Sequence, residues 1–350
     1  MTPSFERLMA DATRLTRAGD LRAATAAIQA ALRGAAAPAR DDDAVVIDVP
    51  AREIDVETVE LPPCAPSDQA GRFIAGRHSH HAAGTREYKL YVPPGYRGQS
   101  LPLVVMLHGC TQDPDDFAAG TRMNEAALER DFFVLYPAQA QNANPSRCWN
   151  WFKHNHQGRG RGEPALLVDM TREVMERYGI DAKRVYVAGL SAGGAMAAVL
   201  GDAYPDLFAA VGVHSGLPTG CAKNVKDAFD AMKHGPSVAA ARSGATPPTI
   251  VFHGDQDATV HPVNGEHVVA ASAGARPSER ERLRGENGRE FTRHVYRDAG
   301  GRVTAEHWVV HGAVHAWSGG SPRGSYTDSK GPDATEEMLR FFFSHALAAR

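Results

Sequence analysis

The 350-residue sequence predicts an α/β protein: a mostly parallel central sheet, helices on both faces of that sheet, and a short helical pair at the N-terminus. Apolar runs typical of buried parallel strands recur along the chain. They are LPLVVMLHG (101–109), DFFVLYP (131–137), RVYVAGL (184–190), AAVGVHSG (209–216) and TIVFHG (249–254). Amphipathic helical patterns separate these runs, and strand alternating with helix indicates βαβ units.

The first 33 residues predict a helical hairpin. Apolar residues recur at helical spacing over 5–15 and again over 21–32, and Asp20 between them can serve as an N-cap. Small, charged and proline residues over 34–44 then indicate a linker. We therefore expect one main domain over 45–350.

The main domain begins with extended segments and ends in a helix. AVVIDV, GRFIAGRHS and REYKLYVPP are typical of strands, and the last alternates as a half-buried edge hairpin would. The polar stretch ASAGARPSERERLRGENGRE (271–290) predicts an exposed loop. A final strand pair, FTRHVYRD and TAEHWVVHG, and the helix DATEEMLRFFFSHAL follow.

The composition is that of an ordinary globular protein, with 43% apolar residues, 23% charged residues and a net charge of −3. This balance gives no electrostatic reason to expect nucleic acid or an anionic membrane as a partner. No apolar run approaches the roughly 20 residues that a transmembrane helix needs. The N-terminus lacks the apolar core of a secretory signal peptide, so the sequence alone favours the cytoplasm or an export route that it does not reveal.

A GxSxG motif, Gly189–Leu190–Ser191–Ala192–Gly193, lies between a predicted strand and a predicted helix. A sharp turn there strains the serine backbone and exposes its hydroxyl above the carboxyl ends of the strands, while the glycines admit close backbone neighbours. Ser191 is therefore a candidate nucleophile.

A serine nucleophile needs a base and an orienting acid, which follow it in the order Asp, His in folds of this kind. Asp255 and Asp257 follow a predicted strand, and Asp257 is the preferred acid because Asp255, nearer the strand end, can tie down loop backbone. His307 and His311 fall in or at the end of the last strand and favour structural roles. His315 lies beyond it in a Gly- and Ser-rich loop and is the candidate base.

The transition state also needs an oxyanion hole. The segment LPLVVMLHGCTQ ends a predicted strand with His108, Gly109 and Cys110. In folds of this kind the loop there donates one backbone amide and the residue after the nucleophile donates the other, so the amides of Cys110 and Ala192 are the two candidate donors.

Aromatic residues cluster in CWNWF (148–152), where Trp149 and Trp151 form either a plug over the core or a wall of the substrate cleft. Trp317 is a further candidate for that wall. The HSHH run (78–81) favours a solvated loop over a metal site, because neighbouring side chains on an extended segment point to opposite faces. We expect no metal and no cofactor.

The sequence resembles the esterase family of short-chain poly(3-hydroxybutyrate) depolymerases, which is related to feruloyl and acetylxylan esterases of the α/β-hydrolase fold. The matching segments are LHGCTQ (107–112), CWNWF (148–152), RVYVAGLSAGGAMA (184–197), HSGLPTG (214–220), FHGDQDATVHPVNG (252–265) and GAVHAWSGGSPRGSYTDSKGPDATEEMLRFF (312–342).

The resemblance implies Ser191 as nucleophile, Asp257 as acid, His315 as base and Cys110 as an oxyanion donor. It also implies a Cys110–Cys148 disulfide, at least one tryptophan lining the acyl site, and an extracellular location. Cys64 and Cys221 could form a second disulfide. The chain departs from the family at its N-terminus, where the helical pair stands in place of a signal peptide.

These observations predict a cofactor-free serine esterase that acts through an acyl-enzyme on poly- or oligo(3-hydroxybutyrate)-type polyesters or small esters. No polymer-binding module follows the last helix, which favours soluble oligomers or small esters over insoluble polymer. Two alternatives stay open: a feruloyl- or acetylxylan-type carbohydrate esterase, and a non-catalytic polymer-binding protein on a hydrolase scaffold.

Overall fold

The computed structural model describes residues 70–81, 83–236, 246–273, 277–285 and 288–348. The predicted helical pair (1–33), the linker (34–44), the strand AVVIDV and Cys64 lie outside the described residues.

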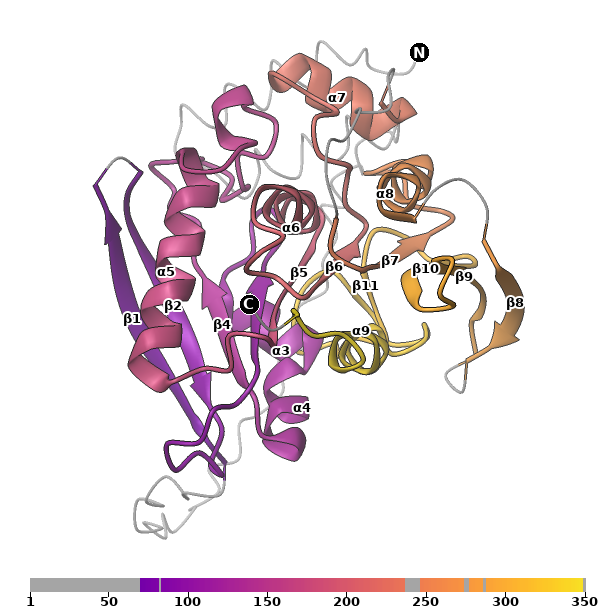
Figure 1. Ribbon diagram of the computed structural model, residues 1–350. Helices are drawn as coiled ribbons and strands as arrows, with labels where there is room; N and C mark the ends of the chain where they lie inside the picture. The colour runs from indigo at the N-terminus through magenta and orange to yellow at the C-terminus, as the bar shows by residue number, and fades with distance from the viewer. Residues whose placement is uncertain (1–69, 82, 237–245, 274–276, 286–287, 349–350) are drawn as a thin grey trace, which may run out of the picture. The chain divides into compact units, whose positions relative to one another are not determined.

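A large sheet organises the described part of the chain, with the strand order β1-β2-β4-β3-β5-β6-β7-β10-β9-β8 (Figure 1). Its strands are β1 (Arg72–His80), β2 (Gly84–Val92), β3 (Leu103–Leu107), β4 (Phe133–Pro137), β5 (Val185–Leu190), β6 (Ala210–His214), β7 (Thr249–Gly254), β8 (Glu279–Arg284), β9 (Glu290–Arg297) and β10 (Val303–Val310). The strands from β4 to β10 in this order pair in parallel, and β1, β2, β9 and β8 join antiparallel at the two edges. The predicted, mostly parallel sheet is thus confirmed.

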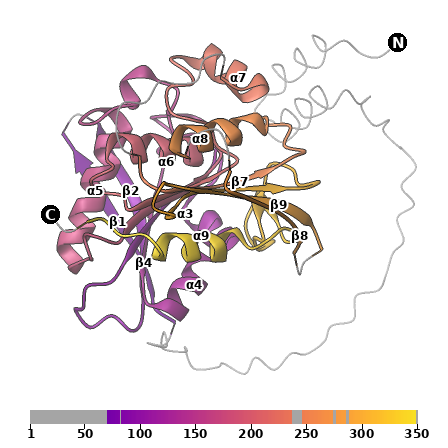
Figure 2. The same ribbon diagram turned by 45° about the vertical axis from the view of Figure 1, so that its right-hand side comes forward.

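Helices cover both faces of this sheet. In Figure 2, α6 and α8 lie above the sheet, and α4 and α9 lie below it. Helix α5 shares a core with α6 and α8. The helices are α3 (Pro114–Thr121), α4 (Met123–Arg130), α5 (Gly162–Tyr178), α6 (Ala192–Ala203), α7 (Val225–His234), α8 (Val263–Ala273) and α9 (Ala334–Phe343), with the short 3₁₀ turn η1 (His154–His156) and the small ribbon β11 (Trp317–Ser318) and β12 (Thr327–Asp328).

The two faces form two hydrophobic cores because side chains alternate along each strand. In β5, Val185 and Val187 belong to the core that also contains residues of α5, α6 and α8. Tyr186 and Ala188 belong to the other core, with residues of α3, α4 and α9. Burial on both faces explains why these strands are continuous apolar runs in the sequence.

Two sequence predictions are wrong. The polar stretch before β9 is not a loop throughout, since Glu279–Arg284 forms strand β8, exposed along its length and paired with β9. The HSHH run is not a solvated loop, because His78 and His80 belong to β1. His78 Nδ1 lies 2.5 Å from a carboxylate oxygen of Glu173, and His80 Nε2 lies 3.3 Å from Asp169, so this face of β1 is fastened to α5.

The parallel strands bring the candidate residues to one edge of the sheet. Most of these strands end just before one residue of interest. Ser191 follows β5, Ser215 follows β6, Asp255 follows β7 and His311 follows β10, while Cys110 lies three residues beyond the end of β3. In open α/β sheets this carboxyl edge is where ligands bind. No helix among the described residues is long and apolar enough to cross a membrane.

Candidate active site

Ser191 occupies a tight turn between β5 and α6. Its backbone has φ 58° and ψ −118°, a conformation that few residues other than glycine adopt. Its amide donates to the carbonyl oxygen of His214, at 2.9 Å. A Cβ at Gly193 would overlap the carbonyl oxygen of Leu107 and lie 2.6 Å from that of His108, so only glycine lets the turn approach β3 so closely.

Asp257 and His315 form a hydrogen-bonded pair. His315 Nδ1 lies 2.6 Å from Asp257 Oδ2, and the other carboxylate oxygen accepts the amides of Thr259 and Val260. Burial alone raises the pKa of Asp257, but the hydrogen bonds from His253 and His315 outweigh it and hold that pKa well below its usual range. Asp257 is therefore ionised and fixed, and it orients the His315 ring with Nε2 left for another partner.

Asp255 belongs to a separate pair. Its carboxylate binds His311 Nδ1 at 2.9 Å and accepts the Gly312 amide at 2.7 Å, while His311 Nε2 lies 2.8 Å from Thr292 Oγ1. These bonds tie the start of the histidine loop to β7 and β9. The structure thus brings Asp257, rather than Asp255, to His315.

His214 connects the serine turn to the histidine loop, and sequence reasoning missed it. Its Nε2 accepts the Ser318 amide at 2.9 Å, and its ring stacks on Trp317, two residues after His315. Burial holds the pKa of His214 well below its usual range, so the ring is neutral. The His214 carbonyl accepts the Ser191 amide. No hydrogen bond among the described residues joins the Ser191 hydroxyl to His315.

The loop after β3 lies against the serine turn. A Cβ on Gly109 would lie 3.6 Å from the Ser191 Cβ, and the Gly109 amide donates to Gln112 Oε1 at 2.9 Å. His108 bonds the Gly109 carbonyl through Nδ1 and accepts the Gln139 amide on Nε2. Burial lowers the pKa of His108 to about 4, which keeps this ring neutral and able to accept the Gln139 amide.

Two backbone amides at this site remain available. No hydrogen bond among the described residues engages the Cys110 amide. Ala192 is the first residue of α6, where an amide has no partner within the helix. Ala192 directly follows Ser191, and Gly109, which precedes Cys110, approaches the Ser191 side chain, so both amides stay candidates for an oxyanion hole.

Of the three described cysteines, two form a disulfide and one is a free thiol. Cys110 and Cys148 form a disulfide that joins the loop after β3 to the aromatic segment (148–152). Cys221 is a free thiol, and burial raises its pKa to about 12. The other half of the expected second disulfide, Cys64, lies outside the described residues.

The three candidate tryptophans pack in the core rather than line an open cleft. Trp149 and Trp317 are 0% and 1% exposed, and Trp151 is 5% exposed. Trp149 Nε1 donates to the carbonyl of His108, and Trp317 Nε1 donates to Thr335 Oγ1. In this structure they support the loops of the site from behind, as a plug over the core would, and the lining of the acyl site by one of them stays a prediction.

A buried polar network, which sequence reasoning also missed, holds the aromatic segment. Glu163 is almost fully buried and accepts hydrogen bonds from Gln139 and from both the amide and the side chain of Asn150. Burial alone raises the pKa of Glu163, but hydrogen bonds, including those from His156 and Asn150, lower it overall. Arg86 completes the network through Gln139, at 3.0 Å.

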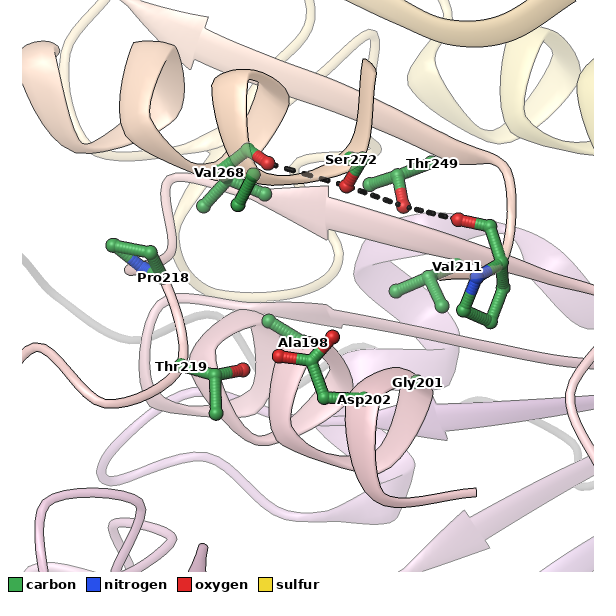
Figure 3. A pocket seen from close by; sticks show the side chains of 11 residues that line it. Ala198, Gly201, Asp202, Val211, Pro218, Thr219, Thr249, Val268 and Ser272 are labelled. Atoms are coloured by element: carbon green, nitrogen blue, oxygen red, sulfur yellow. Dashed lines mark hydrogen bonds between the residues drawn. The ribbon is translucent and has the colours of Figure 1, made fainter. Parts of the chain in front are cut away.

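Two cavities differ in their relation to this site. Figure 3 shows a small one between α6, α8 and the sheet, bordered by Asp202, Thr219 and Ser272; its volume of about 10 Å³ is too small for an ester. A groove of about 1050 Å³ runs beside the loop after β3, and its lining includes His108, Asp113 and Arg147. Within the described residues, no group of three histidine, cysteine, aspartate or glutamate side chains is placed to hold a metal ion.

A strained serine between strand and helix, with acid and histidine loops later along a parallel sheet, defines the α/β-hydrolase fold. The solved acetyl xylan esterase from Aspergillus awamori shares this fold, with a TM-score of 0.61 and 19% identity over 77% of this chain and 99% of that one.

Residues 86–276, more than half of the chain, match the family described as Esterase PHB depolymerase, and the chain belongs to this family. Poly(3-hydroxyalkanoate) depolymerase C of Paucimonas lemoignei is 31% identical over 237 residues, which are 64% of this chain and 57% of that protein. Feruloyl esterase B of Thermothelomyces thermophilus is 30% identical over 51% of this chain and 67% of that protein. The chain thus spans little more than half the length of the depolymerase, and the family resemblance expected from the motifs is confirmed.

Proposed function

We propose that the chain is a serine esterase that hydrolyses carboxylic esters through an acyl-enzyme. The observation that carries the proposal is the buried Asp257–His315 pair at the same sheet edge as the strained Ser191. Family membership supports the same reaction class.

In the proposed reaction the Ser191 hydroxyl attacks the ester carbonyl while His315 Nε2 accepts its proton. The ionised Asp257 stabilises the imidazolium through Nδ1. The amides of Cys110 and Ala192 bind the developing oxyanion. His315 then protonates the leaving alcohol, and a water molecule, activated by the same histidine, releases the acid and restores Ser191.

The proposed substrates are poly- or oligo(3-hydroxybutyrate)-type polyesters and small esters, which the similarity to the Paucimonas depolymerase supports. A feruloyl- or acetylxylan-type carbohydrate ester is the second candidate, which the similarity to the Thermothelomyces feruloyl esterase supports. Comparing the release of acid from hydroxybutyrate oligomers, p-nitrophenyl butyrate and methyl ferulate distinguishes these substrates.

Labelling by a fluorophosphonate probe tests the reaction class. We expect the wild type to be labelled at Ser191 and the Ser191→Ala variant to remain unlabelled and inactive, with circular dichroism showing the same fold for both. A correctly folded wild type that neither labels nor hydrolyses these esters would instead be a non-catalytic binding protein.

We also propose that residues 45–350 form the catalytic domain, preceded by a helical pair (1–33) and a linker (34–44). An extracellular location fits the Cys110–Cys148 disulfide, because such bonds persist in oxidising compartments. Thiol counting on protein taken from the culture medium and from the cell lysate tests this, and a reduced intracellular form would favour the cytoplasm.

A further inference from the structure

Tyr326 lies between the proposed base, His315, and the loop after β3 that carries Cys110, which we call the oxyanion loop. It comes from the segment joining β11 to β12, and its ring centroid is 6.5 Å from that of His315, at an interplanar angle of 79°. Its hydroxyl oxygen is 3.4 Å from Thr111 Oγ1, next to Cys110 in sequence. One side chain therefore borders both halves of the proposed catalytic centre.

The backbone holds Tyr326 in this position. Its carbonyl accepts the Trp317 amide at 2.7 Å. On its other side, the Ser325 amide donates to Asp116 Oδ1 at 2.8 Å, and the Ser325 carbonyl accepts Gln112 Nε2 at 3.2 Å. These bonds keep Tyr326 at φ 52°, a left-handed conformation that is unfavourable for a bulky side chain.

Packing does not account for this arrangement. The side chain of Tyr326 is 47% exposed, whereas the large aromatic residues of the two cores are almost fully buried. The bond to Thr111 is long for a pair of hydroxyl groups, and Thr111 Oγ1 donates instead to the Cys110 carbonyl at 2.6 Å. The Tyr326 hydroxyl can thus donate to another oxygen at little cost, and the residue is exposed enough for a ligand to reach it.

We propose that Tyr326 contacts the alcohol part of the ester, with its hydroxyl donating to a second oxygen in that group. The inference rests on the proposed function, because it follows from His315 as the group that protonates the leaving alcohol. His315 Nδ1 is bound to Asp257, so the proton leaves from Nε2 and the alcohol must lie beside the ring that Tyr326 flanks. The preferred alcohol carries an oxygen beyond the ester bond, as a hydroxyacyl unit does.

Two esters with the same acyl group test the proposal: the linear dimer of 3-hydroxybutyrate and methyl 3-hydroxybutyrate. Only the dimer has a leaving alcohol with a further oxygen. Because kcat/KM reports the steps up to acylation, we expect Tyr326→Phe to lower it about 5- to 10-fold for the dimer, the range for one hydrogen bond, and less than about twofold for the methyl ester.

A matched control uses another partly exposed aromatic residue. Phe343 on α9 is 38% exposed, and its ring contacts Phe132 and Tyr186 rather than the loops of the site. Phe343→Leu should leave the ratio between the two esters unchanged, whereas Tyr326→Leu should reduce the dimer rate further than Tyr326→Phe does.

The outcomes separate this inference from the proposed function. Equal losses on both esters in Tyr326→Phe would make the residue a support for His315, and no loss on the dimer would remove it from the substrate site. Either result, with fluorophosphonate labelling of Ser191 retained, overturns the role of Tyr326 alone. A wild type that does not label and does not hydrolyse either ester overturns the proposed function and this inference together.

Discussion

Asp257 and Asp255 are two residues apart and have the same functional group, yet their surroundings give them different tasks. Asp257 is 5% exposed, and its carboxylate is held by two backbone amides in addition to His315. Asp255 is partly exposed and holds the backbone of Gly312 and the ring of His311. At the scale of single residues, the hydrogen-bond partners therefore favour Asp257 as the proposed acid and give Asp255 the role of holding the loop backbone.

This difference predicts unequal effects of two matched substitutions. Asp257→Asn should lower kcat by on the order of 10³- to 10⁴-fold, because an amide neither stabilises the imidazolium nor fixes the required tautomer of His315. Asp255→Asn keeps one acceptor for Gly312 and should lower kcat less than about tenfold. Steady-state hydrolysis of p-nitrophenyl butyrate measures both, and a larger loss for Asp255→Asn would reverse the assignment.

At the scale of elements, the strand–turn–helix unit of β5 and α6 depends on close approach to the end of β3. The approach is possible because Gly193 has no side chain at the point where a Cβ would meet the carbonyls of Leu107 and His108. The same contact brings the loop after β3, which carries Gly109 and Cys110, against Ser191. Stability of the turn and assembly of the site are therefore coupled.

Gly193→Ala should consequently lower both the stability of the protein and the reactivity of Ser191. Overpacking at this point should lower the free energy of unfolding by about 1–3 kcal/mol or more, and any backbone shift that relieves it moves the Cys110 amide away from Ser191. Urea denaturation and the rate of fluorophosphonate labelling measure the two effects. Gly158→Ala is the control, since its nearest neighbour would be a flexible arginine side chain at 3.4 Å, and neither quantity should change appreciably.

The disulfide links the loop after β3 to the segment between β4 and η1. Cys110 and Cys148 are 38 residues apart, and a cross-link closing a loop of that length stabilises a fold by about 3–4 kcal/mol through the unfolded chain. The Cys110→Ser/Cys148→Ser double variant should lose about this much and become insensitive to dithiothreitol in urea denaturation. Cys221→Ala should keep the response to dithiothreitol, and its disappearance there would contradict the assigned pairing.

At the scale of the whole molecule, several histidines are buried as neutral rings in or beside the sheet. His307 in β10 is the clearest case: burial lowers its pKa to about 3, with a smaller effect from His253 and His294. The unfolded chain has a histidine pKa of about 6.5 and so binds more protons than the folded protein between these values. The contribution of His307 is therefore present at neutral pH and is lost as the pH falls below about 6.5.

Acidification from pH 7 to pH 5 should cost about 2 kcal/mol of unfolding free energy for His307 alone, at about 1.4 kcal/mol per pH unit below 6.5. His307→Gln has no ionisation in this range and should lose that part of the pH dependence, whatever its stability at pH 7. Urea denaturation at the two pH values measures the difference. His234→Gln, at the exposed end of α7, should retain the wild-type pH dependence; an unchanged slope in His307→Gln would show that His307 does not contribute to it.

Much of this architecture could be predicted from sequence because the relevant signals are local. The central strands are apolar on both faces, so they stand out as runs, and the candidate Ser, Asp and His follow strand ends in a fixed order. β8 gave no such signal, since all its residues are exposed and it is held to β9 partly by cross-strand ion pairs such as Arg293–Glu281. The burial of the tryptophans could not be decided from sequence, because polar neighbours along the chain do not reveal burial by distant segments.

The sequence by itself determined the alternation of central strands and helices, the family, and the candidate serine, aspartates and histidines that follow strand ends. Only the tertiary structure decided which of them meet. Parallel pairing aligns Gly254 of β7 with Val310 of β10, which sets Asp255 beside His311 and leaves Asp257 to reach His315. The contact between Thr111 and Tyr326 spans 215 residues, and no local pattern encodes it, because such neighbours are fixed by sheet register and loop packing rather than by chain spacing.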